Sequence, residues 1–266
     1  MKLFAHAHAT HPDWRMALAL AAAQIEAQRA DPAGLHVRQP TLGWAYFSDH
    51  YAAQAQALLA ELQQRWPGVS WVGSVGVGVS ANGVEYFDEP ALVLMLSDLP
   101  RDQFCVFSGA RPLGQAPKGF VASTAQVHAD GRVADLGELL VDLSGRTDTG
   151  YLFGGLASAR TQPLHLADGV FEGGLSGVAF GPEVALVSRV TQGCQPVGPV
   201  RHITQADRNV IAQLDDEPSL ECLLRDLGVS GREPREALPR IRETLVGLVD
   251  RSDDALSRPG QFGADT

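Results

Sequence analysis

Hydrophobic and polar positions alternate or recur in helical periods along most of the chain. Residues 2–8 alternate, as expected for a short strand. From Trp14 to about Arg29 the apolar residues fall at helical spacing, and Thr10 or His11 is the expected N-cap. The same analysis predicts a helix over 51–66 and strands at 41–47, 69–80, 90–96 and 104–109.

The second half of the chain repeats this order. "GFVASTAQV" is typical of a strand, and "DLGELLVDL" predicts a helix with Asp135 as its N-cap. "GYLFGGLAS" and two glycine-dotted segments, "DGVFEGGLSGVAFG" and "VALVSRVTQG", indicate further strands. Beyond 198 the patterns predict two short strands around a turn and then an amphipathic helix that has Pro218 in its first turn.

The two halves also match in their residues. "LLAEL" at 58–62 corresponds to "LLVDL" 81 residues further on, and "WVGSVGV" corresponds to "LFGGLAS" at the same offset. We therefore interpret the repeats, about 38–110 and 118–198, as an internal duplication. The expected fold class is α/β, or mixed α+β. Two duplicated βαββ lobes would carry largely antiparallel mixed sheets flanked by helices.

Composition and charge exclude several classes of partner. The net charge of −10 argues against nucleic acid and against docking on an anionic membrane. The three cysteines contain no CxxC pair, so neither a disulfide framework nor a thiolate zinc site is indicated. No signal peptide or membrane span is evident, so a cytoplasmic location without membrane insertion is expected.

The opening "HAHATH" is the first candidate site. On a strand, His6 and His8 point to the same face, and His11 could curl back to join them around Zn²⁺. The nearest carboxylate is Asp13, so the spacing alone favours a structural role: a strand edge followed by a helix cap. His128 and His165 fall near turns, where we expect exposure.

Glycine clusters form the second candidate. Glycine inside a strand often marks close approach of backbone or ligand, the alternative being close packing against another element. Neither a P-loop nor a dinucleotide fingerprint is present.

Around "TQGCQPVGP" two prolines stiffen a turn with a cysteine at its tip, and a histidine eight residues on could approach it across a hairpin. The expected ligand-binding residues are Gly154, Gly155, Gly173, Gly174, Gly193, Cys194, Pro196 and His202.

Several segments in this order resemble the FIST family, the sensory domain named for F-box and intracellular signal transduction proteins. They are "YLFGGLAS", "DGVFEGGLSGVAF" and "RVTQGCQPVGPVRHITQADRNVIAQLDDEPSLECL". The last segment departs from the family pattern at Asp216 and Ser219. The resemblance implies an N-terminal-type domain over 1–217 and the beginning of a C-terminal-type domain over 218–266, which is expected to be incomplete.

The resemblance implies a sensor without established enzymatic activity. It would bind a small molecule, such as an amino acid, and pass a signal to a downstream protein, with no catalytic residue and no cofactor. Three alternatives remain open at this point. They are a recruitment module without a small ligand, a haem- or metal-binding gas sensor, and a hydrolase built on cysteine and histidine.

Overall fold

The computed structural model describes residues 3–187, 196–208, 210–229, 234–242 and 244–247. The chain divides into two compact units, Met1–Leu186 and Val187–Thr266, which are described separately below. This division lies upstream of the boundary at 217 that the sequence indicates.

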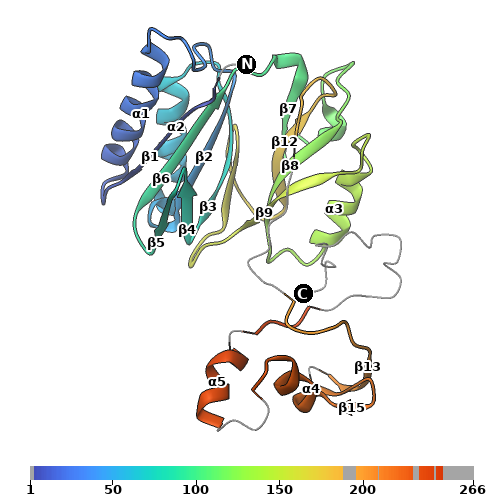
Figure 1. Cartoon of the computed structure of the whole chain (residues 1–266). Helices are drawn as coiled ribbons and strands as arrows, with labels where there is room; N and C mark the ends of the chain where they lie inside the picture. Colours follow the sequence, from blue (N-terminus) through green and yellow to red (C-terminus); the bar gives the residue numbers. More distant parts are fainter. Residues whose placement is uncertain (1–2, 188–195, 209, 230–233, 243, 248–266) are drawn as a thin grey trace. The chain divides into compact units, whose positions relative to one another are not determined.

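The first unit contains two sheets that pack face to face between layers of helices (Figure 1). The six-stranded sheet has the order β1-β6-β2-β3-β10-β11, and the four-stranded sheet has the order β7-β12-β8-β9. The strands of the six-stranded sheet are β1 (Ala5–Thr10), β2 (Leu42–Ser48), β3 (Ser70–Gly76), β6 (Ala91–Ser97), β10 (Leu164–Ala167) and β11 (Val170–Glu172). Those of the four-stranded sheet are β7 (Phe104–Phe107), β8 (Thr124–Asp130), β9 (Leu152–Ala157) and β12 (Leu175–Phe180).

Helices α1 (Trp14–Ala30) and α2 (Ala55–Arg65) cover the outer face of the six-stranded sheet (Figure 1). Their apolar stripes are buried against β1, β2, β3 and β6, as the helical spacing predicts. The N-cap of α1 is Asp13, whose carboxylate accepts from Arg15 N at 2.9 Å. The prediction of Thr10 or His11 is wrong, because Thr10 still belongs to β1. A short 3-10 helix, η1 (Asp49–Gln54), precedes α2.

Helix α3 (Leu136–Ser144) covers the outer face of the four-stranded sheet together with the loop that follows β7. Asp135 is its N-cap residue, as predicted. Two further 3-10 turns, η2 (Arg101–Gln103) and η3 (Leu113–Gln115), flank β7. Between the sheets lies a third cluster, to which both contribute, with Trp44, Val72, Val178 and Phe180 among its buried members.

Four strands in each sheet have the same order and the same directions. In β1-β6-β2-β3 the only parallel pair is β2 with β3, and in β7-β12-β8-β9 it is β8 with β9. Each parallel pair is joined by a helix, α2 or α3, as a crossover connection requires. The mixed α/β class is therefore confirmed. The repeated strand order supports an internal duplication, which remains an interpretation.

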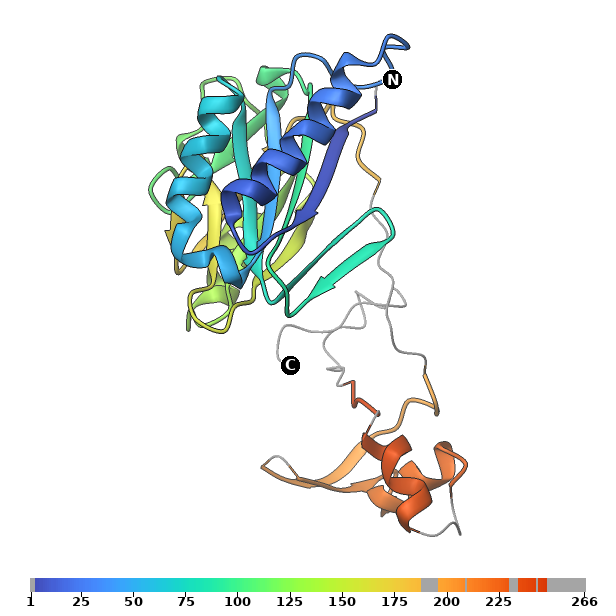
Figure 2. The ribbon, with the colours of Figure 1, turned by 90° about the vertical axis from the view of Figure 1, so that its left-hand side faces the viewer.

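The segment predicted as one strand over 69–80 instead forms two strands. Gly76 ends β3, and after Val77 the chain enters a separate hairpin of β4 (Gly78–Ala81) and β5 (Val84–Phe87). Asn82 and Gly83 form its turn with positive φ values of 23° and 83°. The hairpin is a ribbon of its own (Figure 2) that packs on β6 and β2.

The second unit contains a small antiparallel sheet of β13 (Ile203–Asp207), β14 (Val210–Leu214) and β15 (Glu217–Pro218). Helix α4 (Ser219–Asp226) follows, and Cys222 is its buried residue. Helix α5 (Pro234–Arg242) is the last described element. The two strands around a turn and the following helix are confirmed, but Pro218 is the N-cap of α4 rather than a residue of its first turn.

Candidate functional site

A chain of polar side chains crosses the layer between the two sheets. Trp44 Nε1 donates to Gln126 Oε1 at 2.6 Å, and Gln126 Nε2 donates to the hydroxyl of Tyr46 at 3.0 Å. The Tyr46 hydroxyl in turn lies 2.9 Å from His128 Nε2. Trp44 and Tyr46 come from β2, while Gln126 and His128 come from β8, so the two sheets contribute alternately.

Trp44 fixes the direction of the first two hydrogen bonds in this chain. An indole N–H can only donate, so the Gln126 oxygen must accept and its NH₂ group must donate to Tyr46. The Tyr46 hydroxyl, which already accepts from Gln126, still carries its own proton, and we infer that it donates this proton to His128 Nε2. In a neutral imidazole the proton then resides on Nδ1, so His128 presents an Nδ1–H donor at the end of the chain.

Burial keeps both the Tyr46 hydroxyl and the His128 imidazole uncharged near pH 7. His128 is 3% exposed, and burial, with a smaller contribution from nearby His165, lowers its pKa to about 4. Burial also raises the pKa of Tyr46 to about 12. His128 Nδ1 is buried and has no hydrogen-bond partner. A buried donor without a partner costs about 1–3 kcal/mol, so this atom is a place where an acceptor would be stabilising.

A second buried histidine lies beside the first, and both of its ring nitrogens are bonded. His165, on β10, lies 3.0 Å from the carbonyl oxygen of Gly173 through Nε2 and 2.6 Å from Ser176 Oγ through Nδ1. Because a carbonyl only accepts, Nε2 carries the proton and Nδ1 accepts from Ser176. Burial lowers the pKa of His165, so both imidazoles are neutral at pH 7 with opposite tautomers.

An ion cluster borders these histidines. Asp130 is 2% exposed and binds Arg132 through both carboxylate oxygens, and Arg132 also contacts Glu172 at 3.0 Å. The hydrogen bond from Arg132 holds the pKa of Asp130 below its usual value. The carboxylate at this border is therefore ionised and already paired.

Three glycines near His128 in the strand register have open space at their Cβ positions. In the parallel register Gly155 lies opposite His128, and paired residues direct their side chains to the same face. A Cβ at Gly155 would meet nothing within 4 Å, and the same holds for Gly173 and Gly174. Gly173 and Gly174 have positive φ values of 74° and 64° and connect β11 of one sheet to β12 of the other. Three of the predicted glycines thus gather around His128, Ser176 and His165.

The glycine at position 154 is explained by backbone packing rather than by open space for a ligand. Its φ is 146°, and a Cβ there would lie 1.9 Å from the carbonyl oxygen of Val127. Gly73 in β3 repeats this arrangement, with a φ of 154° and a Cβ position 1.8 Å from the oxygen of Ala45. At these two positions the glycine is required by close backbone approach, which is the structural alternative in the sequence analysis.

The N-terminal histidines are held by protein groups. His8 Nδ1 lies 2.5 Å from the Tyr86 hydroxyl, Asn82 Nδ2 lies 3.4 Å from His6 Nε2, and His11 Nδ1 accepts from Asp13 N at 2.9 Å. Within the described parts of the chain no three His, Cys, Asp or Glu side chains gather to hold a metal ion. His6 and His8 thus lie in strand β1, as the sequence predicts, whereas the helix cap after them is Asp13.

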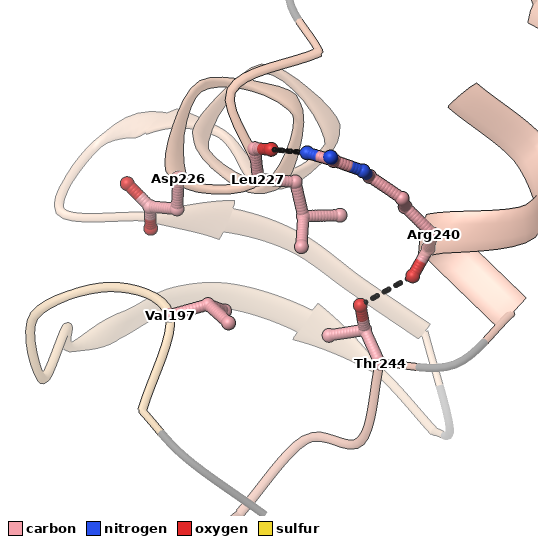
Figure 3. Close-up of a pocket in the computed structure, with 5 residues that line it drawn as sticks. All are labelled: Val197, Asp226, Leu227, Arg240 and Thr244. Atoms are coloured by element: carbon pink, nitrogen blue, oxygen red, sulfur yellow. Dashed lines mark hydrogen bonds between the residues drawn. The ribbon is translucent and has the colours of Figure 1, made fainter. Parts of the chain in front are cut away.

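The remaining candidates lie in or beside the second unit. Gly193 and Cys194 lie outside the described residues. Pro196 and His202 are exposed, and His202 N donates to Asp215 Oδ1 at 3.0 Å. An open hollow of about 380 Å³ in this unit is lined by Val197, Asp226, Leu227, Arg240 and Thr244, whose side chains Figure 3 draws.

Polar groups around this hollow are already bonded. Arg240 Nη1 donates to the oxygen of Leu227 at 3.2 Å, and Thr244 Oγ1 donates to the oxygen of Arg240 at 2.7 Å (Figure 3). Arg201 donates to the carboxylate of Asp226. The hollow therefore offers a ligand fewer polar atoms without a hydrogen-bond partner than the layer between the sheets does.

Cys105, in β7 of the first unit, is the other thiol to consider. Burial raises the pKa of this thiol, which disfavours its reactive thiolate form.

The central residue of the site was misjudged from the sequence. His128 and His165 were expected near turns and exposed, yet they are 3% and 1% exposed. The signal was present in "TAQVHAD", because its polar residues alternate and so share one face of a strand. That face is covered by the other sheet rather than by water.

Comparisons with known proteins place the chain in a family. A family model described as the FIST N domain matches residues 41–217. An uncharacterized protein, Rv0628c of Mycobacterium tuberculosis, is 30% identical over 268 residues, which cover 95% of this chain and 66% of the relative. Another, Mb0898c of Mycobacterium bovis, is 28% identical over 95% of this chain and 65% of its own length. The chain thus spans just under two thirds of the length of these relatives.

Proposed function

Because this chain belongs to the FIST N domain family, we propose that it is a sensory domain that binds a small carboxylate-bearing molecule, such as an amino acid, beside His128. In this proposal the bound state is passed on to a partner protein. No helix in the described part of the chain has the length and hydropathy to cross a bilayer.

The observation that carries the proposal is the unmet Nδ1–H of His128. A neutral donor in a buried setting selects an acceptor, either a carbonyl or a carboxylate oxygen. The acceptor would remove a penalty of about 1–3 kcal/mol that the free protein retains. In this proposal a hydrogen bond from the Tyr46 hydroxyl to Nε2 holds the imidazole in the tautomer that donates through Nδ1.

The space beside Gly155 supports access to this atom. Gly155 is exposed, and its absent side chain leaves open space on β9, opposite His128 in the parallel register. On the β12 flank lies Ser176, which is engaged with His165. A ligand entering past Gly155 would also approach Gly173 and Gly174, where bare main chain faces open space.

Binding here can be sensed because both sheets form the site. Trp44 and Tyr46 belong to the six-stranded sheet, whereas Gln126, His128 and Gly155 belong to the four-stranded sheet. A ligand that bonds more strongly in one relative position of the sheets shifts the population toward that position. The shift is the signal that a partner would read.

A thermal-shift screen followed by isothermal titration tests the proposal. The panel contains the common amino acids and their amides, added to the wild-type chain and to Gly155→Leu. Leucine at this position fills the open space without backbone strain, because φ is not positive and no atom lies within 4 Å. At a ligand concentration about a hundredfold above Kd, stabilisation of about 2.7 kcal/mol corresponds to a Tm rise of roughly 5–10 °C.

Gly137→Leu is the matched control, because Gly137 in α3 is equally open and lies outside the site. We expect a carboxylate to stabilise the wild type and Gly137→Leu while its amide binds more weakly, and we expect Gly155→Leu to lose the effect. Absence of binding by every member of the panel would contradict the proposal, as would equal binding by Gly155→Leu.

One observation favours recruitment of a protein as a second function. Val141 on α3 and Leu156 on β9 are 74% and 60% exposed, on the same sheet-and-helix layer. Where such side chains form one patch, they are typical of interaction sites. Val141→Glu and Leu156→Glu should leave ligand titration unchanged and weaken capture of a partner. Loss of ligand binding in both variants would argue against this second function.

A further inference from the structure

Two hairpins occupy corresponding places in the repeated strand order but differ in what they pair with. After β3 comes β4–β5 with its Asn82–Gly83 turn, and after β9 comes β10–β11 with its Asp168–Gly169 turn. Asn-Gly and Asp-Gly are the preferred sequences of two-residue hairpin turns. The second hairpin crosses to the opposite sheet, where β10 pairs antiparallel with β3 and Leu166 lies opposite Gly73.

Three contacts show that the two halves face each other through corresponding residues. Trp44 bonds to Gln126 and Tyr46 to His128, each pair 82 positions apart, and Val77 N approaches Ser158 Oγ at 3.5 Å, 81 positions apart. Each residue thus meets its own counterpart. Residues meet their own counterparts in this way when two similar halves are related by a twofold axis. Under such an axis, each contact that one half makes with the other is repeated in reverse.

In the strands that the structure describes, the pairing of β10 with β3 has no counterpart in the other half of the first unit. β3 is paired on both sides, with β2 and β10, whereas its counterpart β9 pairs only with β8 among the described strands. The other edge of β9 is exposed at Gly154, Gly155 and Leu156. An exposed strand edge presents unpaired N–H and C=O groups and is a template for another strand.

We propose that the β4–β5 hairpin has a second position, in which β4 pairs antiparallel with the open edge of β9. Transferring the register of β10 on β3 to the other half places Ser80 opposite Gly154 and Val79 opposite Gly155. In this position the pairing of β4 with β9 would match the observed pairing of β10 with β3. It requires no ligand, so it stands apart from the proposed sensory function.

The hairpin is attached in a way that permits this movement. Val77 forms its base between Gly76 and Gly78, and Val77 already contacts the residue that follows β9. In the observed position two polar contacts hold the hairpin, His8 with Tyr86 and His6 with Asn82. Both involve side chains that are not fully buried, so water can replace these partners when the hairpin moves. Main-chain hydrogen bonds to β9 would be gained.

A disulfide trap tests the second position. Val79→Cys and Gly155→Cys would place two thiols opposite each other only when β4 lies on β9, and a disulfide requires Cβ atoms about 3.5–4.5 Å apart. Gly155 accepts a side chain because nothing lies within 4 Å of its Cβ position. The full chain is oxidised mildly, and the linked peptides are identified by mass spectrometry so that the natural cysteines can remain.

Val79→Cys combined with Val141→Cys is the matched control, because Val141 is exposed and belongs to α3 rather than to β9. We expect an intramolecular disulfide in the first pair at least tenfold faster than in the control. Rates that are equal, with all introduced thiols reactive toward a soluble probe, would overturn the proposal. A purely intermolecular disulfide would also overturn it and would assign the edge to a second copy of the chain.

Discussion

Trp44 Nε1 donates a 2.6 Å hydrogen bond to Gln126 Oε1, and these two residues occupy corresponding places in β2 and β8. The contact joins the two sheets. It also sets the direction of the next hydrogen bond, from Gln126 Nε2 to the Tyr46 hydroxyl, because the indole can only donate. The proton that we infer on His128 Nδ1 follows if Tyr46 donates onward to Nε2.

Replacing Trp44 with Phe should destabilise the first unit. The Gln126 oxygen would lose its donor in a buried layer, so we expect the free energy of unfolding to fall by about 1–3 kcal/mol in urea titration. Trp66→Phe is the control, because Trp66 Nε1 donates to Glu26, whose side chain is 52% exposed and can bond to water. An equal loss in both variants would mean that the inter-sheet chain has no special role.

Stability should fall as the pH drops from 6.5 toward 4. The pKa of His128 is about 4 in the folded chain against 6.5 when unfolded, so the unfolded state binds more protons in this range. The stabilisation is complete above pH 6.5, is lost as pH falls toward 4, and amounts to about 3 kcal/mol. His165, whose pKa is also lowered, adds to the same trend, and ionised Asp130 borders the pair.

Urea titrations at pH 7 and 4.5 measure this loss, with His128→Asn as the comparison. The variant lacks the titrating group, so the difference between its two unfolding free energies should be smaller than in the wild type. An identical pH dependence in both proteins would show that His128 does not titrate as stated.

Alanine at Gly73 or Gly154 should disrupt the parallel strand pairs. Each new Cβ would lie within 2 Å of a backbone oxygen at a φ that side chains rarely adopt. We expect a loss of about 2–5 kcal/mol in thermal or urea unfolding. Gly155→Ala, one residue along, should change stability by less than about 0.5 kcal/mol, because its Cβ position is open. Similar effects at Gly154 and Gly155 would contradict this explanation.

Two glutamines of α1 protect the outer edge of β1. Gln28 bonds to both N and O of His6, at 3.0 and 2.6 Å, and Gln24 makes the same pair of contacts with His8 at 3.5 and 2.8 Å. Gln24→Ala combined with Gln28→Ala should therefore increase self-association, measured by light scattering. Gln64, exposed on α2, carries the control substitution to alanine.

Local patterns predicted most of the secondary structure because they depend on neighbouring residues. The stripes of α1 and α2 and the alternation in β8 were visible in the sequence, and so was the match between "LLAEL" and "LLVDL". That match corresponds to α2 and α3, which join the two parallel strand pairs. The second part of "VSWVGSVGVGVS" forms β4, outside the six-stranded sheet that contains β3. Gly76 and Gly78 permit this change of chain direction, which the hydrophobic periodicity does not reveal.

The candidate site could be predicted only in part. Alternation shows which residues share a strand face but not what covers that face, so His128 and His165 were placed in solvent. Gly155, Gly173 and Gly174 were selected as ligand contacts, and their positions are open, whereas Gly154 is explained by contact with Val127. Bringing Trp44 against Gln126 depends on the packing of two sheets, which no local pattern specifies.

The protonation of His128 is best measured by nitrogen NMR on the chain labelled with ¹⁵N-histidine. At pH 7 we expect His128 to be neutral with its proton on Nδ1, and we expect the Nδ1 resonance to shift when a carboxylate ligand from the panel is added. His165 provides an internal reference, because its proton should be on Nε2. A His128 proton on Nε2, or a charged imidazolium at this pH, would contradict the hydrogen-bond chain and the ligand site built on it.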